Sequence, residues 1–327
     1  MTTASEAGTA RIITVTPNPA LDITLHVDGI RLGETHRVPR GTSRAGGKGL
    51  NVARVAHQQG HEVLAIAPVG GPTGRQLTTE LEAAGVPHRL VPVAAETRRT
   101  FALVDTRTDQ TSIFNEFGSP LSVSEWEALS REVEQSLGDG AVGPPGPEAL
   151  VVSGSLPGEA PPQFHTTLIE LAHTRGIPAL IDTSGPGLLE AAKAGADLLK
   201  PNREELHEAT GIRDPVLASQ ELLRLGARQV LTSAGAEGML AFDAETPSKF
   251  WTARLPHPLK GNPTGAGDAA VAAAAVQLAL GSGSIRSILR AASSWSAAAV
   301  LMPVAGQISP LYEQLAHQLI LTEGNLK

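Results

Sequence analysis

The sequence has no cysteine among its 327 residues. This absence excludes disulfide bonds, thiolate metal sites and a cysteine nucleophile. Long apolar runs are also missing, because the longest, at about 269–280, is shorter than the roughly 20 residues that a membrane-spanning helix needs. The N-terminal segment lacks the basic and apolar regions of a signal peptide. We therefore expect a cytoplasmic protein with no membrane partner.

Basic charge is scarce as well. The chain carries 26 lysines and arginines against 33 acidic residues, and no long basic run stands out. A nucleic-acid partner is therefore not expected. What the chain does have is 41% hydrophobic residues, 34 glycines and 24 prolines. That composition fits one large or two small α/β domains with a sizeable core and many short loops.

Short apolar runs alternate with helical segments from residue 150 onward. Apolar runs at 150–153, 179–182, 198–199 and 229–232 are each followed by a polar or glycine-containing loop. Repeated strand–helix units of this kind predict a mostly parallel sheet that is covered by helices on both faces. Ligands of such sheets bind at the carboxyl ends of the strands.

Strands of a different kind are predicted nearer the N-terminus. The segment 21–27 alternates apolar and polar residues, which is typical of a half-exposed strand. We expect 34–40 to return as a second exposed strand and two later segments to add further ones. Together they predict a small protruding sheet, or lid, built from about 21–41 and 97–117. Asn115, at the end of the last strand, would then face a ligand.

Further expectations concern boundaries. Residues 1–10 are predicted to be a flexible tail and 11–327 a single domain. Ser124 with Glu127 has the pattern of a capping box, which predicts a helix over 124–137. The final helices are expected at 283–302 and 309–321.

The stretch Asn262–Pro263–Thr264–Gly265–Ala266–Gly267–Asp268 precedes a long alanine-rich helix. Thr264 is a plausible cap, and the two glycines leave backbone amides unshielded at the helix N-terminus, where unpaired donors favour an anion. Asp268 would project into the same place. An anion hole beside a carboxylate suits phosphoryl transfer, in which the carboxylate takes a proton from the attacking hydroxyl. The alternative is a capped helix whose aspartate only complements the helix dipole.

A second glycine loop runs into a helix at 44–56. Gly46 and Gly47 allow close backbone approach, while Lys48 and Asn51 offer donors on the first turn, an arrangement that suits a sugar hydroxyl or a phosphate. The loop is not a Walker A motif, because Gly49 follows the lysine where serine or threonine would be needed. The alternative is that the glycines serve only packing.

Two weaker motifs follow strands later in the chain. Asn202 and Glu205 could hold a hydrated magnesium ion, which prefers a few oxygen ligands and keeps several waters. An N-capped surface helix explains the same spacing and is the favoured reading of that motif alone. The loop 233–238 could pass close to a nucleotide phosphate or could be a hairpin turn.

Taken together, the motifs and their order resemble the ribokinase-like PfkB carbohydrate-kinase family. Within it, the chain looks most like the phosphosugar branch of 1-phosphofructokinase, tagatose-6-phosphate kinase and the minor 6-phosphofructokinase. The motifs are TPNPALD at 16–22, AGGKGLNVAR at 45–54, VSGSLP at 152–157, LIDTSG at 180–185, KPNREEL at 200–206 and GAGD at 265–268.

This resemblance implies a three-layer α/β/α sandwich with a mostly parallel central sheet and a β-sheet lid. It also implies transfer of the γ-phosphoryl group from ATP, with Mg²⁺, to a ketohexose phosphate. Fructose 1-phosphate is placed first, ahead of tagatose 6-phosphate and fructose 6-phosphate. In this family the lid often also joins two copies, so a homodimer is expected.

The resemblance also assigns roles to residues. Asp268 matches the catalytic base, and the amides of Gly265, Ala266 and Gly267 match the anion hole. The matched substrate-binding residues are Asp22, Gly46, Gly47, Lys48, Asn51 and Arg98. The matched nucleotide-binding residues are Lys200, Ser233, Gly235 and Gly238, and Asn202 and Glu205 match the residues tied to magnesium, which we expect them to hold through water.

Two other functions remain open. A kinase for an unphosphorylated sugar or nucleoside would share the fold, but such a substrate needs no cations at Lys48 and Arg98. A sugar-phosphate-binding regulator without activity would share the scaffold, but it would not need the intact Asp268 and its glycine loop.

Overall fold

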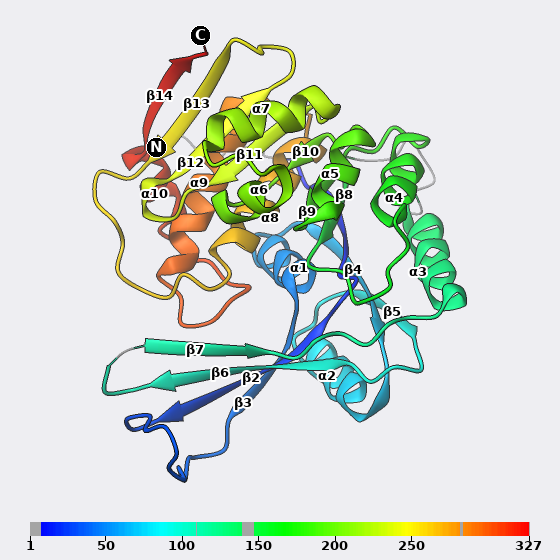
Figure 1. The fold of residues 1–327 in the computed structure, drawn as a ribbon, viewed down its shortest axis with the longest axis vertical. Coiled ribbons are helices and arrows are strands. Elements are labelled where there is room, and N and C mark those ends of the chain that lie inside the picture. The colour runs from blue at the N-terminus through cyan, green and yellow to red at the C-terminus, as the bar shows by residue number, and fades with distance from the viewer. Residues whose placement is uncertain (1–7, 109, 139–146, 282–283, 327) are drawn as a thin grey trace.

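The main body of the protein is a large sheet with helices on both faces (Figure 1). The computed structural model describes residues 8–108, 110–138, 147–281 and 284–326. Across these residues the sheet runs in the order β14-β13-β12-β11-β10-β9-β8-β1-β4-β5. The strands are β1 (Arg11–Val15), β4 (Glu62–Val69), β5 (His88–Pro92), β8 (Glu148–Ser153), β9 (Ala179–Asp182), β10 (Leu198–Leu199), β11 (Gln229–Ser233), β12 (Met239–Asp243), β13 (Lys249–Arg254) and β14 (Ile320–Asn325).

The helices form two layers, each with its own apolar core. Successive residues of β1 show the division, because Ile12 is buried in one core and Ile13 in the other, as the alternation of a strand requires. One layer holds α1 (Lys48–Gln58), α2 (Gly71–Ala83), α8 (Ala266–Ala279), α9 (Ile285–Val300) and α10 (Tyr312–Gln318). The other holds α3 (Val123–Ser136), α4 (Phe164–His173), α5 (Pro186–Lys193), α6 (Arg203–Thr210) and α7 (Pro215–Leu225). The expected α/β/α sandwich is confirmed.

Helix α8 is largely buried at its N-terminal end. Residues 268–276 are all buried, and most of them are alanines. Small side chains let the helix pack closely against α1 and α9 and over the sheet. This packing brings the first turns of α1 and α8 together near the carboxyl end of β1.

A smaller sheet protrudes from the body, as expected (Figure 1). Its order is β3-β2-β6-β7, and we call it the lid. The strands are β2 (Ala20–Val27), β3 (Thr42–Gly46), β6 (Arg98–Asp105) and β7 (Gln110–Asn115).

The second strand of the lid was predicted in the wrong place. Residues 34–40 form no strand, and β3 lies at 42–46 instead. Pro39 has no N–H to donate to a ladder, and β2 already pairs with β3 from Ala20↔Gly46 to Thr24↔Thr42. The pairing therefore leads directly into the glycine loop before α1, so that loop lies at the base of the lid.

The C-terminal edge of the sheet was also not predicted. Strands β12, β13 and β14 are antiparallel to their neighbours, whereas a helix was expected to run to residue 321. Helix α10 ends at Gln318, and 320–325 pairs with β13. The sheet is therefore parallel from β5 to β11 and antiparallel beyond.

Two local boundaries differ from the expectation. The capping box of α3 is formed by Ser122 and Glu125, two residues before the predicted pair, with the Ser122 N–H donating to Glu125 Oε2 at 2.7 Å. Residues 1–7 of the predicted tail lie outside the described residues, and Ala10 belongs to the body, because it is buried and its carbonyl accepts the Glu62 N–H. Within the described part of the chain, no helix is both long and apolar enough to cross a membrane.

Candidate active site

The predicted base lies where α1 and α8 meet. Asp268 is in the first turn of α8, is only 8% exposed, and accepts a hydrogen bond of 2.8 Å from Asn51 Nδ2 of α1. The helix is capped by Gly265 rather than by Thr264, and no side chain completes the cap. Gly265 has φ of 85°, and a Cβ there would lie 2.7 Å from Ala305 Cβ, so only glycine fits this turn.

Burial controls the protonation of Asp268. It raises the pKa of the Asp268 carboxyl to about 6, and the negative charge of Asp182 adds to the rise. The Asn51 hydrogen bond and the charges of Lys48 and Lys200 oppose it. A carboxylate with a pKa near neutrality is ionised at pH 7 and still has appreciable proton affinity, which suits a general base.

Asp182, at the end of β9, holds two lysines close to Asp268. Ser153 Oγ donates to Asp182 Oδ2 at 2.8 Å, while Lys200 Nζ lies 3.4 Å from Oδ1 and Lys48 Nζ 3.5 Å from Oδ2. Burial alone would raise the pKa of Asp182, but the charges of Lys200 and Lys48 together with the hydrogen bonds from Ser153 and Lys200 lower it. Sequence reasoning quoted Asp182 and Ser153 within motifs without giving either a role. Each of these two residues lies at the end of a buried strand, and that position in the sequence could have identified them as site residues.

Lys48 is the first residue of α1 and joins the two sides of this cluster. Its pKa is raised chiefly by the charge of Asp182, with a further contribution from Glu205, whose Oε1 accepts a hydrogen bond of 3.2 Å from Lys48 Nζ. Lys48 therefore stays a cation, directed toward the strand ends.

Asn202 and Glu205 form the cap of α6, as the structural alternative predicted. The Glu205 N–H donates to Asn202 Oδ1 at 2.8 Å, and the Asn202 N–H donates to Glu205 Oε2 at 2.9 Å. No group of three or more histidine or acidic side chains placed to hold a metal occurs in the part of the chain that the structure describes. A magnesium ion would fit here only through waters.

An open cavity of about 410 Å³ adjoins the N-terminus of α8. Its lining includes the predicted nucleotide residues Ser233, Gly235 and Gly238 together with Ala266 and Gly267. The loop 233–238 joins antiparallel strands β11 and β12, so the hairpin alternative is correct and the same turn also faces the cavity. Gly238 has φ of 95°, and a Cβ there would lie 2.0 Å from the Ala253 carbonyl oxygen.

Lys200 is not part of that lining but lies close to it. A Cβ on Gly267 would lie 3.5 Å from Lys200 Nζ. The lysine therefore places its charge next to the backbone turn that the sequence identified as an anion hole.

Asp22 is the acidic residue on the face of the lid that carries Thr100 and Arg44, its partners on β6 and β3. Burial raises the pKa of Asp22 to about 6, against the opposing effects of a hydrogen bond with Thr100 and nearby arginine charges. A Cβ on Gly46 would lie 1.9 Å from Asp22 Oδ2. Gly47 has φ of 110°, and a Cβ there would come within 2.7 Å of the Thr16 side chain. Both glycines are therefore needed to bring the loop against Asp22 and Thr16.

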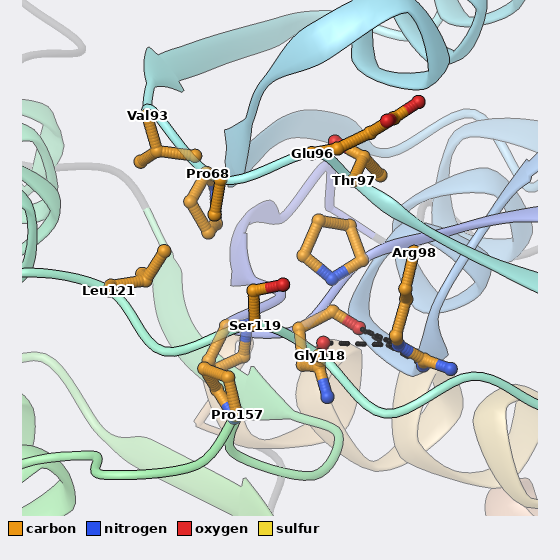
Figure 2. Close-up of a pocket in the computed structure, with 13 residues that line it drawn as sticks. Pro68, Val93, Glu96, Thr97, Arg98, Gly118, Ser119, Leu121 and Pro157 are labelled. Carbon is orange, nitrogen blue, oxygen red and sulfur yellow. Dashed lines mark hydrogen bonds between the residues drawn. The ribbon is translucent and has the colours of Figure 1, made fainter.

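Arg98 lies at the base of the lid, at the edge of a small cavity of about 30 Å³ (Figure 2). Its Nε donates to Asn18 Oδ1 at 3.0 Å and its Nη2 to the Asn18 carbonyl at 3.1 Å. Burial lowers the pKa of the guanidinium. Asn115 accepts a hydrogen bond of 3.1 Å from Thr100 Oγ1. The cavity has room for about one water molecule, so it is too small to hold a sugar.

The model of the pfkB family of carbohydrate kinases matches residues 16–310. The chain belongs to this family. Among other pfkB proteins, it is 36% identical over 304 residues to the "ATP-dependent 6-phosphofructokinase isozyme 2" of Mycobacterium tuberculosis, covering 91% of this chain and 86% of that protein.

Solved structures of the pfkB type agree with the fold. Phosphofructokinase-2 from Escherichia coli in complex with fructose-6-phosphate superposes with a TM-score of 0.80 at 29% identity, covering 94% of this chain and 98% of that one. Ribokinase from Arabidopsis thaliana, solved with ribose and ATP, has a TM-score of 0.69 at 21% identity over 94% of this chain and 99% of that one. The second likeness shows only that the ribokinase-like fold is shared.

Proposed function

We propose that this pfkB protein transfers the γ-phosphoryl group of ATP to a hydroxyl group of fructose 6-phosphate. The observation that carries the proposal is the position of Asp268. Its carboxyl group has a pKa of about 6 and lies in the first turn of α8, next to backbone amides of a glycine-rich turn. A base beside an anion-binding helix N-terminus is what transfer to a hydroxyl group requires.

Each reacting part has a place in this arrangement. ATP would occupy the 410 Å³ cavity, whose lining reaches Gly267, with its terminal phosphate toward the amides of 265–267. Asp268 would take the proton of the acceptor hydroxyl, and Asn51 would hold the carboxylate in orientation through its 2.8 Å hydrogen bond. Lys48 and Lys200 would face the charge that moves with the phosphoryl group.

The residues of this site fit a magnesium ion that is held through its water molecules. Asn202 and Glu205 already bond each other's backbone, so their remaining acceptor capacity suits waters of a hydrated ion rather than the ion itself. Bound with ATP, Mg²⁺ would neutralise phosphate charge.

The acceptor would bind between the lid and the body. Asp22, Gly46, Gly47 and Asn51 offer hydrogen-bonding groups for sugar hydroxyls, and Arg98 offers a cation for the phosphate. The sequence favoured fructose 1-phosphate, but the 36% identical relative is named a 6-phosphofructokinase, and this supports fructose 6-phosphate as the first choice.

A panel of acceptors tests this function. ADP formation should be measured with fructose 6-phosphate, fructose 1-phosphate, tagatose 6-phosphate, fructose and adenosine. We expect the highest kcat/KM with fructose 6-phosphate, and at least about 100-fold less with fructose, because the lost charged hydrogen bonds are each worth about 1.5–3 kcal/mol. A preference for fructose or adenosine would contradict the phosphosugar assignment, and no ADP with any acceptor would support a silent regulator.

We further propose that two copies join through the lid. Ile23, Phe101 and Phe114 lie side by side across β2, β6 and β7, on the face opposite Asp22, and Phe114 is 57% exposed. A second copy of this face would cover that apolar row. Light scattering should give twice the chain mass for the wild type and a lower mass for Phe114→Asp. A wild-type monomer at all concentrations would contradict this assembly.

A further inference from the structure

One arginine on the lid has no role in the site described above. Arg44 of β3 is directly opposite Asp22 of β2 in an antiparallel pair, so the two side chains share a face of the lid. On the other side of β2, Thr100 is opposite Asp22, and Arg98 precedes it by two residues and shares its face. Asp22 is therefore flanked by an arginine on each neighbouring strand.

The guanidinium of Arg44 is not used inside the protein. No hydrogen bond or ion pair joins it to another residue in the described ranges, although the residue is half-buried. The two other arginines near Asp22 are different. Arg98 donates to Asn18, and Arg54 is paired with Glu80.

The acids around Arg44 do not offset its charge by direct contact. Glu80 already accepts the Ala45 N–H at 2.9 Å as well as Arg54. Burial and the charge of Arg54 lower the pKa of Arg44, while Glu80 and Asp22 act against that. A half-buried guanidinium with free donors gains most from an anionic ligand that completes its hydrogen bonds.

We propose that Arg44 binds the phosphate group of the acceptor together with Arg98, while Asp22 between them binds its hydroxyl groups. The inference rests on the proposed function, because it requires a phosphorylated acceptor. Strands β3 and β6 are separated by two strand spacings, about 10 Å. Arg44 can extend across that gap and bind one phosphate with its planar guanidinium in bidentate fashion. Arg98, whose nitrogens already donate to Asn18, Thr100 and Glu116, would add its positive charge on the other side.

The first test is Arg44→Ala, with Arg40→Ala as the matched control. Arg40 is exposed and lies just before the same strand, so its removal takes away the same charge without touching the site. We expect Arg44→Ala to raise the KM for fructose 6-phosphate about 10- to 100-fold, with the KM for ATP and kcat within about threefold. Arg40→Ala should change none of these values. Equal, small effects of the two variants would overturn the inference.

A second measurement separates phosphate binding from mere support of Asp22. Inorganic phosphate should inhibit the wild type in competition with fructose 6-phosphate, and its inhibition constant should rise about tenfold or more in Arg44→Ala, with Arg44→Lys in between. A purely structural role would instead lower kcat/KM for fructose and fructose 6-phosphate by the same factor and leave phosphate inhibition unchanged, and that result would overturn the inference. If Arg44→Ala fails to fold, Arg44→Gln takes its place.

Failure of the inference and of the proposed function give different results. If the wild type phosphorylates fructose 6-phosphate and the Arg44 variants match it, only the inference fails. If the wild type acts on no phosphorylated sugar and inorganic phosphate does not inhibit it, both fail.

Discussion

Replacing Asp268 with asparagine should lower kcat by about 10²- to 10⁴-fold, the usual contribution of a general base, with the KM values for ATP and acceptor changed only a few-fold. Asparagine keeps the shape of the side chain and an oxygen that can still accept the 2.8 Å hydrogen bond from Asn51. It removes only the capacity to take a proton. Steady-state kinetics over a range of both substrates would measure this split, since loss of kcat without change in KM marks a group that acts in the transition state.

The folding control for Asp268→Asn has a definite sign. Burial raises the pKa of Asp268 from 3.8 to about 6, so the folded protein binds the proton more tightly than the unfolded chain and loses stability as pH rises between these values. At pH 7.5 the ionised carboxyl of Asp268 therefore lowers the free energy of unfolding. The melting temperature of Asp268→Asn should therefore be no lower than that of the wild type. A kcat of the variant close to the wild-type value would show that Asp268 is not the base.

The same carboxyl should set the acidic limb of the wild-type pH profile. A base must be deprotonated to act, so kcat should fall as pH drops through about 6. Asp22 has a similarly raised pKa, and its protonation would act on binding of the acceptor, which appears in kcat/KM. A kcat that stays flat down to pH 4.5 would contradict the assignment.

Replacing Gly46 with alanine should weaken acceptor binding strongly. The added Cβ would lie 1.9 Å from Asp22 Oδ2, so the carboxylate must move away from the loop and lose its position for sugar hydroxyls. We expect the KM for fructose 6-phosphate to rise about 10- to 100-fold, the value of one or two charged hydrogen bonds, while the KM for ATP stays within about threefold.

Gly158→Ala is the matched control for this change. A Cβ at that position would have only an ordinary contact of 3.8 Å with Pro120, and its backbone is not in the left-handed region. It should leave both KM values unchanged. A Gly46→Ala enzyme with wild-type kinetics would show that Asp22 does not bind the acceptor from its present position.

The central sheet could be predicted because its signals are local. Each parallel strand is a short apolar run followed by a loop, so both the order of elements and the loops that line the site were accessible. The antiparallel edge could not be predicted. Strand β13 (Lys249–Arg254) mixes polar and apolar residues without a clear pattern, and no two-residue turn motif precedes it. The α3 boundary was ambiguous in the sequence itself, since Ser122 and Ser124 each precede a glutamate by three residues.

The site was predictable only where a motif carries its own geometry. Asp268 and Gly265 lie at the first turn of one helix, so the sequence spacing alone could place the carboxyl group beside the unshielded amides. The contacts of Asp182 come from Ser153, Lys48 and Lys200 on other elements, and no local pattern encodes them. The requirement for glycine at position 46 comes from its pairing next to Asp22 in the lid, which only the structure shows.

The alanine composition of α8 has a consequence for altering this protein. Side chains that end at Cβ cannot change rotamer to make room for a larger neighbour. A bulkier residue at any of the buried alanines in 269–275 should therefore shift the helix and its first-turn carboxyl with it. Laboratory evolution toward other acceptors should therefore accumulate changes in the lid strands and almost none in this helix.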